Sequence, residues 1–233
     1  MKKKVLTLIS VIFILLIISL IIYFSIYYKS EDISKYFEDN LLKIEEIDSG
    51  YFLDGPGEED VIIFYPGAKV EYTSYIPLLS QLAIEGVDTF LLKMPFNFAF
   101  FKQNAADDII DNYNYKNYYL MGHSLGGVVA ANYANNHDNV TGLILLASYS
   151  TKPIRNELSL LSIYGDQDKV LNINKYNNNK PNFPDNSKEI IIKGANHSGF
   201  GNYGEQKGDG TATITKEEQQ EFTVKEILIF LSE

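Results

Sequence analysis

Short apolar runs alternate with amphipathic stretches along most of the chain. Runs of β-branched and aromatic residues predict buried strands at residues 61–65, 87–93, 117–122, 140–148, 158–165 and 188–194. The spacing of apolar residues predicts helices at residues 73–85, weakly at 102–112, at 124–137, and in a last helix that follows a capping box of Thr215 and Glu218. This alternation predicts an α/β fold with a mainly parallel central sheet and helices on both faces.

Two further segments have a different pattern. Residues 29–50 mix charged and apolar positions, which predicts a short amphipathic helix and then a first edge strand. Residues 172–182 are rich in Asn and predict a loop. In a sheet of this kind the active site lies at the carboxyl ends of the strands.

The first part of the chain is far more apolar than the rest. Residues 5–28 contain no charged side chain and follow three lysines at positions 2–4. About 20 apolar residues suffice for a helix to cross a bilayer, and Tyr23, Tyr27 and Tyr28 stand where an interfacial aromatic belt would lie. The segment predicts a single-pass membrane helix with its N-terminus in the cytoplasm and the remaining chain outside.

A cleaved signal peptide is the alternative for this segment. Signal peptides have a shorter apolar region of about 7–15 residues and a small-x-small cleavage site, and no such pair stands near Ser25 or Ser30. The lysines and the length also disfavour a buried helix of a soluble core. The predicted division is therefore an anchor at 1–28, a stalk with the first edge element at 29–50, and a folded domain at 51–233.

Composition narrows the chemistry. The chain has no cysteine, which excludes disulfides, a thiol nucleophile and zinc sites built on thiolates. From Lys29 onward, 17 basic residues stand against 30 acidic ones, a net charge of −13. Such a surface is a poor match for nucleic acid or for anionic lipid head groups.

The strongest local motif is Gly-His-Ser-Leu-Gly-Gly at residues 122–127, between a predicted strand and a predicted helix. A nucleophile elbow needs this context, because the tight turn pushes the Ser124 hydroxyl into the cleft and leaves space only for glycine on either side. The helix N-terminus there also favours developing negative charge. An ordinary glycine-rich turn is the alternative interpretation.

A serine nucleophile needs a base, and the chain has three histidines. His123 lies inside the elbow, and His137 lies at the end of the following helix, about 20 Å from Ser124 along the axis. His197 stands in a glycine-rich loop, residues 194–201, directly after the last predicted strand. We therefore predict His197 as the base rather than a surface loop residue.

The base needs a carboxylate to orient it. Asp166 and Asp168 both follow the strand at 158–165 and are both candidates. Asp107, Asp108 and Asp111 precede the serine in a predicted helical segment and are expected to be solvated.

These motifs, in the order Ser-Asp-His, resemble the α/β-hydrolase family, and the resemblance covers about residues 60–233. It is closest to small carboxylesterase-like or lipase-like members without a lid. In that family the acid loop reads G-x-x-D followed by an apolar residue, which implies Asp168 as the acid and Asp166 as the second choice.

The resemblance also implies an oxyanion hole. One donor is the backbone N–H of Leu125, directly after the nucleophile. The second comes from the loop after an early strand, where this chain has Tyr-Pro-Gly-Ala-Lys at 65–69 with Tyr65 in place of the usual histidine. Ala68 is the matching donor, and Lys69 is the donor if the loop is shifted by one residue.

The resulting prediction is a membrane-anchored serine hydrolase that cleaves a small-molecule ester and uses no metal or organic cofactor. Acyl transfer, amide or peptide hydrolysis with the same triad, and a non-catalytic membrane-tethered binding module are the alternatives. The aromatic segment 94–101 is expected either to wall the cleft or to face the membrane or the core. The glycine-rich segment 199–210 is expected to cover part of the site.

Overall fold

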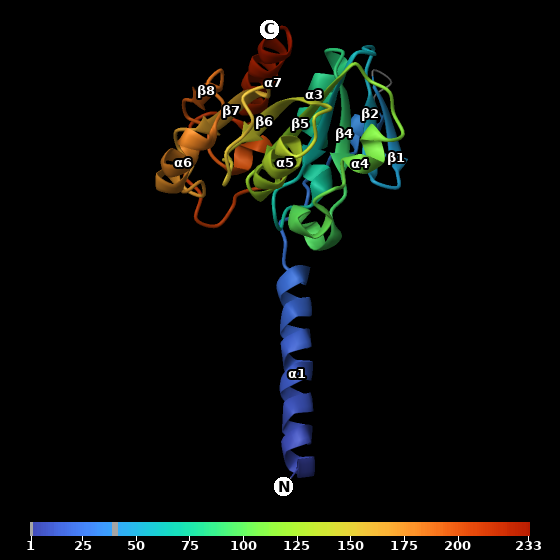
Figure 1. Cartoon of the computed structure of the whole chain (residues 1–233), viewed down its shortest axis with the longest axis vertical. Coiled ribbons are helices and arrows are strands. Elements are labelled where there is room, and N and C mark those ends of the chain that lie inside the picture. Colours follow the sequence, from blue (N-terminus) through green and yellow to red (C-terminus); the bar gives the residue numbers. More distant parts are fainter. Residues whose placement is uncertain (1, 39–41) are drawn as a thin grey trace.

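A computed structural model describes residues 2–38 and 42–233, and its folded domain is built on one eight-stranded sheet (Figure 1). The strand order is β1-β2-β4-β3-β5-β6-β7-β8, in which β3 to β8 run parallel and β1 and β2 form an antiparallel hairpin at one edge. The strands are β1 Lys43–Ile47, β2 Gly50–Asp54, β3 Asp60–Tyr65, β4 Asp88–Leu92, β5 Asn117–His123, β6 Val140–Leu146, β7 Ser159–Gly165 and β8 Lys188–Ile192.

Helices cover both faces of this sheet, because the parallel strands are apolar on both sides. Helices α3 and α7 pack on one face, and α5 packs on the other together with α4. The helices are α1 Lys2–Ser25, α2 Lys35–Glu38, α3 Ile76–Ile84, α4 Asp107–Ile110, α5 Leu125–Asn135, α6 Ile173–Asn179 and α7 Lys216–Leu231. Short 3₁₀ turns are η1 Tyr72–Tyr75, η2 Pro95–Asn97, η3 Ala99–Lys102, η4 Lys180–Asn182 and η5 Ser198–Phe200.

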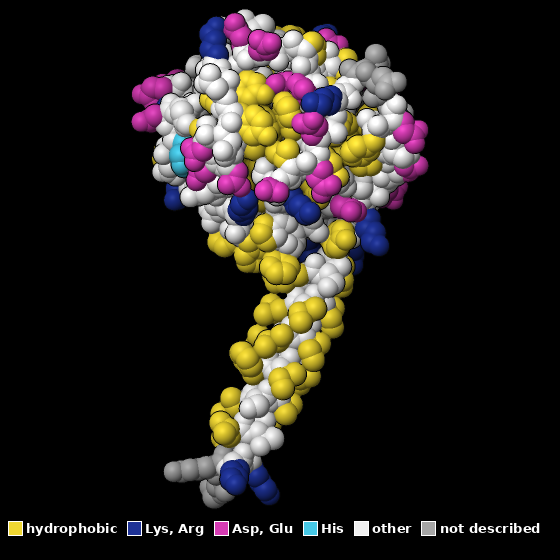
Figure 2. Space-filling view, turned by 90° about the vertical axis from the view of Figure 1, so that its right-hand side faces the viewer, with side chains coloured by type: hydrophobic (Ala, Val, Ile, Leu, Met, Phe, Trp, Pro, Cys, Tyr) yellow, Lys and Arg dark blue, Asp and Glu magenta, His cyan; other side chains and the backbone are white. Residues whose placement is uncertain are grey.

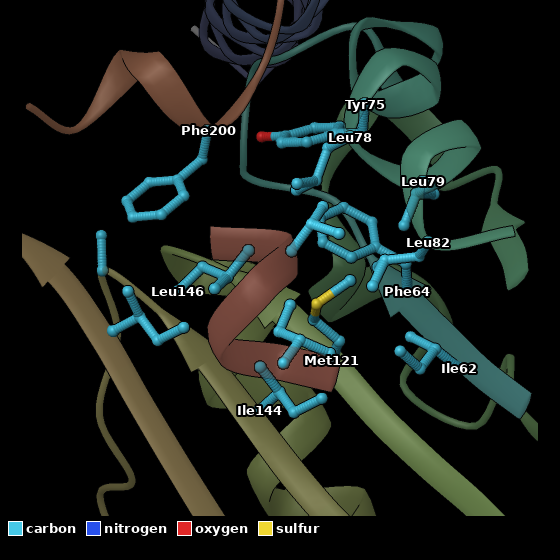
Figure 3. Packing of buried hydrophobic residues seen from close by; sticks show 14 of the residues in the cluster. Ile62, Phe64, Tyr75, Leu78, Leu79, Leu82, Met121, Ile144, Leu146 and Phe200 are labelled. Atoms are coloured by element: carbon cyan, nitrogen blue, oxygen red, sulfur yellow. The ribbon is translucent and has the colours of Figure 1, made fainter. Parts of the chain in front are cut away.

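One layer of the core leads directly to the carboxyl edge of the sheet. Figure 3 shows side chains of β3, β5 and β6 packed against Leu78, Leu79 and Leu82 of α3. Tyr75 and Phe200, both fully buried, close this layer, and the Tyr75 hydroxyl points out of it. The core therefore fixes the loops that follow the strands.

The predicted α/β fold with a mainly parallel sheet and helices on both faces is confirmed, and so is the Thr215–Glu218 capping box of α7. Strand β2 was not predicted; its Phe52 pairs with Phe90 of β4, and the two rings stack at 4.5 Å. The weak helix expected at 102–112 is only the single turn of α4 after η3.

The expectation of a loop at 172–182 is wrong, because this segment forms α6 and η4. The Asn172 side chain caps α6 by accepting a hydrogen bond from the Lys175 N–H at 2.9 Å. Tyr176, buried in the core, bonds to Ser162 and Glu189. One cap and one buried aromatic side chain outweigh the low helix propensity of asparagine.

Helix α1 projects away from the domain as a single rod (Figure 1). It is long and apolar enough to cross a membrane, and none of its apolar stretch is buried. With about 1.5 Å per residue, its 24 residues span about 36 Å, more than the hydrocarbon core of a bilayer requires.

Candidate active site

Ser124 lies in a strained turn between β5 and α5. Its φ of 52° and ψ of −124° place a non-glycine residue in a region that L-amino acids rarely adopt. A Cβ on Gly122 would lie 2.6 Å from the Gly126 carbonyl carbon, and a Cβ on Gly126 would lie 2.2 Å from the Tyr65 carbonyl oxygen. The two glycines therefore allow the turn to close and to pack against the loop after β3.

Two hydrogen bonds hold this turn from β6. The Ser124 N–H donates to the Leu146 carbonyl at 2.9 Å, and the Ser148 hydroxyl donates to the Ser124 carbonyl at 2.7 Å. The Ser124 side chain is left facing a cleft.

His197 and Asp168 are brought together by the loops after β8 and β7. His197 Nδ1 lies 2.8 Å from Asp168 Oδ2, and both side chains are almost fully buried. The other carboxylate oxygen of Asp168 accepts hydrogen bonds from the N–H groups of Val170 and Leu171, at 2.8 and 2.7 Å. Because a carboxylate only accepts, Nδ1 carries the proton in this bond and Nε2 keeps its lone pair.

Asp166, the second candidate acid, is placed differently. Its side chain is exposed and accepts a hydrogen bond from the Gly194 N–H at 2.7 Å. It therefore holds the turn after β8, whereas Asp168 contacts the histidine.

Ser124 and His197 line the same cleft, which has a volume of about 230 Å³. The remaining lining residues are mostly apolar or small: Leu125, Val128, Ala147, Ser148, Tyr149, Val170, Leu171, Asn172 and Lys175. Within the described part of the chain, neither segment 94–101 nor segment 199–210 contributes a side chain to this lining.

The segment 199–210 instead bonds to the loops that carry Asp168 and His197. Asp209 accepts hydrogen bonds from the N–H groups of Ser198 and Lys169, at 2.9 and 3.3 Å. The expectation that this segment covers the cleft is thus not met, because it does not line the cleft and its Asp209 instead connects the loops of His197 and Asp168.

In the loop after β3, the backbone N–H groups on either side of Ala68 are engaged in hydrogen bonds. The Gly67 N–H donates to the Tyr75 hydroxyl at 3.2 Å, and the Lys69 N–H donates to the Asn97 carbonyl at 2.8 Å. Between them, the Ala68 N–H has no partner among the hydrogen bonds of the described residues. This arrangement favours Ala68 over Lys69 as the donor that would act with the Leu125 N–H.

Sequence reasoning missed a second buried pair, Tyr75 and His123. The Tyr75 hydroxyl lies 2.8 Å from His123 Nδ1, and the rings of His123 and His197 are 4.5 Å apart. Burial, and secondly the neighbouring His197, lower the pKa of His123 well below its usual value. No sequence signal distinguishes Tyr75 from any other core aromatic residue.

The third histidine lies outside the site, and no metal centre accompanies it. His137 stacks on Tyr133 at 3.7 Å and bonds to the Tyr133 carbonyl at the end of α5, away from the cleft. Across residues 2–38 and 42–233, no group of three or more His, Asp or Glu side chains is placed to hold a metal ion.

Comparisons with known proteins identify the family to which this fold belongs. The sequence profile of the alpha/beta hydrolase family matches residues 61–221. The chain belongs to the alpha/beta hydrolase family. The predicted family, fold and enzyme class are thereby confirmed, while the roles of individual residues stay predictions. No match is found among the curated proteins.

Solved structures with the same fold are distant in sequence. Est1E from Butyrivibrio proteoclasticus is 15% identical with a TM-score of 0.59, over 82% of this chain and 99% of that one. A dienelactone hydrolase from Anabaena variabilis is 13% identical with a TM-score of 0.59, over 80% of this chain and 97% of that one. A bacterial membrane phospholipase A is 14% identical with a TM-score of 0.62, over 100% of this chain and 98% of that one.

Proposed function

We propose that this alpha/beta hydrolase is a serine hydrolase that cleaves carboxylic esters through Ser124, His197 and Asp168. One observation carries the proposal: His197, bonded to Asp168 at 2.8 Å, lines the same small cleft as a serine held at a φ of 52°. A buried, carboxylate-oriented imidazole beside a serine in a strained turn is the arrangement that nucleophilic acyl transfer needs.

In the proposed reaction, the Ser124 oxygen attacks the ester carbonyl carbon while His197 Nε2 accepts the hydroxyl proton. Asp168 stabilises the resulting imidazolium through Nδ1. When the tetrahedral intermediate collapses, the carbon–oxygen bond of the ester breaks and His197 gives the proton to the leaving alcohol. Water, deprotonated by the same histidine, then attacks the acyl carbon; the bond between the acyl carbon and the Ser124 oxygen breaks, and His197 returns the proton to that oxygen as the acid leaves.

The negative oxygen of the intermediate would be stabilised by backbone donors. Leu125, the first residue of α5, places its N–H at the N-terminus of that helix. The close approach of Gly126 to the carbonyl of Tyr65 brings the loop of Ala68 next to it. Removing one such donor typically costs about 10²–10³ in kcat.

We propose further that α1 anchors the enzyme in a membrane as a single-pass helix, with residues 1–28 as the anchor and the catalytic domain outside the cytoplasm. The length and full exposure of α1 support an anchor, and the lysines before it support a cytoplasmic N-terminus. The likeness to a membrane phospholipase A, which extends over the whole chain, is consistent with this arrangement. Digestion of the domain by protease added to intact cells tests the orientation, and a protected domain would contradict it.

Hydrolysis of p-nitrophenyl butyrate by the detergent-solubilised full chain tests the catalytic proposal. We expect Ser124→Ala to lower kcat by a factor on the order of 10⁵–10⁶ and to abolish labelling by a fluorophosphonate. Ser80→Ala is the matched control, since this buried hydroxyl on α3 has no hydrogen-bond partner in the described structure and lies outside the cleft. A wild-type protein that neither turns over the ester nor takes the label would refute the proposal.

A further inference from the structure

The loop after β4 carries four phenylalanines next to the membrane helix. We call Phe96, Phe98, Phe100 and Phe101 the aromatic rim. Phe96 and Phe100 are each 62% exposed and Phe101 is 50% exposed. Exposed aromatic groups of this size generally mark a surface that contacts another apolar phase.

The aromatic rim is continuous with the apolar surface of α1. The ring of Phe24, in the last turn of α1, lies 5.2 Å from Phe96, 5.4 Å from Phe98 and 5.5 Å from Phe101, measured between ring centroids. Figure 2 shows hydrophobic side chains at the base of the domain beside α1, with basic side chains above them. A helix that spans a bilayer would therefore bring the rim to its surface.

The backbone of the rim is strained in a way that keeps these rings outside. Phe96 has a φ of 55°, which is unfavourable for a bulky residue, whereas Asn97, at 57°, is of a type that tolerates this region. The strained turn presents Phe96 to solvent rather than to the core, so packing within the domain does not explain it. Contact with lipid would explain it, since Phe is among the side chains that interfacial segments bury at the boundary between head groups and acyl chains.

The site itself is tied to the end of α1. Tyr28 donates its N–H to the Lys69 carbonyl at 2.7 Å, and its carbonyl accepts from the Glu71 N–H at 2.8 Å. Since Tyr28 is three residues beyond Ser25, the end of α1 lies within about 11 Å of this backbone. The last residue of the segment predicted as the anchor is thus bonded to the loop that carries Ala68.

The same loop is bonded to the rim. The Lys69 N–H donates to the Asn97 carbonyl, and the Lys69 ammonium lies 3.8 Å from the ring centroid of Tyr23 on α1. The loop that carries Ala68 is therefore held between the membrane helix and the rim, on the carboxyl edge of the sheet. With α1 in a bilayer, this edge and the cleft beside it face the lipid.

We propose that the aromatic rim inserts into the interface of the membrane that α1 spans, and that the substrate is an acyl ester of a membrane lipid. The substrate class rests on the proposed serine-hydrolase function, whereas the membrane contact rests on the rim alone. The net charge of −13 beyond the anchor disfavours anionic lipids. A zwitterionic or uncharged head group is therefore the one that this enzyme accepts.

The membrane contact is tested without any reference to activity. The chain lacks cysteine, so Phe100→Cys and Ile229→Cys each carry a single environment-sensitive fluorophore on the full chain in phosphatidylcholine vesicles. Ile229, 42% exposed, lies on the last part of α7, at the end of the domain opposite α1 (Figure 1). We expect the label at 100 alone to shift to shorter wavelength and to be quenched by doxyl-labelled lipid. Equal quenching by aqueous iodide at both positions would overturn the contact.

The substrate class is tested by comparing two substrates. We expect Phe96→Ser/Phe100→Ser to lower fatty-acid release from phosphatidylcholine vesicles by at least about tenfold, and to change the hydrolysis of soluble p-nitrophenyl butyrate by no more than about twofold. Ile229→Ser is the matched control and should change neither rate.

The outcomes separate the two proposals. A wild-type enzyme that cleaves the soluble ester but releases no fatty acid from phosphatidylcholine vesicles, with or without added diacylglycerol, would overturn the lipid substrate and leave the hydrolase. An equal fall on both substrates in the double variant would overturn the role of the rim. A wild-type enzyme that cleaves neither ester would overturn the proposed function itself, while the fluorescence result would still decide the membrane contact.

Discussion

The last residue of β5 and the loop after β8 each place a buried histidine at the carboxyl edge of the sheet. His123 and His197 are equally inaccessible, each 1% exposed, with their rings 4.5 Å apart. Their partners differ. His197 Nδ1 bonds to the Asp168 carboxylate, whereas His123 Nδ1 bonds to the Tyr75 hydroxyl and its Nε2 has no partner in the described structure.

In the proposed mechanism, the partner rather than burial distinguishes the histidine that acts as the base from its neighbour. A carboxylate offsets the cost of charging a buried imidazole, and a tyrosine hydroxyl does so far less. Burial accordingly lowers the pKa of His123 well below its usual value, so this ring is neutral at neutral pH. A neutral neighbour lets His197 take up a proton without a second positive charge beside it.

The largest expected effect is the difference in kcat between exchanging His197 and exchanging His123 for asparagine. In the proposed mechanism His197→Asn removes the base and should lower kcat on p-nitrophenyl butyrate by a factor on the order of 10⁵–10⁶. His123→Asn removes only a neighbour that positions the base, and its cost should stay below about 100-fold.

The pH profile of kcat/KM separates these two roles further. The His123→Asn enzyme should keep an ascending limb that reports its base, because His197 and Asp168 are intact. Comparable losses in the two variants would contradict the distinction between the histidines.

A smaller fall in kcat is expected when the aspartates after β7 are exchanged for asparagine. Asp168→Asn keeps the shape of the side chain but removes the charge that orients and stabilises His197, so kcat should fall by about 10³–10⁴. Asp166→Asn is the matched control, since its exposed side chain keeps an acceptor for the Gly194 N–H. Its rate should stay within about twofold of the wild type, and the assignment of the acid would be wrong if Asp166→Asn were the more damaging change.

The three residues of the proposed triad could be predicted from the sequence. Ser124, His197 and Asp168 stand in short motifs directly after strands, and parallel strands bring their carboxyl ends together wherever helices separate them. A polar residue next to an apolar run is visible without knowledge of the fold. The resemblance to a family then favoured one aspartate over the other.

The environment of His123, by contrast, depends on contacts between residues that are distant in the sequence. Tyr75 meets His123 across 48 positions, and its hydroxyl is the only part that distinguishes it from the aromatic core around it. Helix α6 likewise depends on Tyr176, whose hydroxyl reaches Ser162 on β7.

The environment of the aromatic rim depends in the same way on α1, whose Phe24 lies about 70 positions before Phe96 in the sequence. Contacts of this kind leave no local pattern of apolar and polar residues. The buried His123–Tyr75 pair and the packing of the rim against α1 therefore became visible only in the folded structure.

The smallest expected effect is on stability, and it tests the neutral state of His123. Because the pKa of His123 is lower in the folded protein than in the unfolded chain, the unfolded chain binds more protons below about pH 6.5 and the folded state loses stability there. Above that pH the histidine contributes no such dependence. Down to its folded-state pKa, the wild type should lose up to about 1.4 kcal/mol per pH unit more than His123→Asn.

Denaturant unfolding of the full chain in detergent between pH 8 and pH 5 measures this difference. Tyr75→Phe is the informative control, because it removes the hydroxyl that bonds to His123 Nδ1 and leaves the ring buried. Since burial is the largest cause of the lowered pKa, Tyr75→Phe should keep most of the wild-type acid sensitivity. If wild type and His123→Asn lost stability in parallel as the pH fell, His123 would not be a buried neutral ring, and the contrast drawn with His197 would fail.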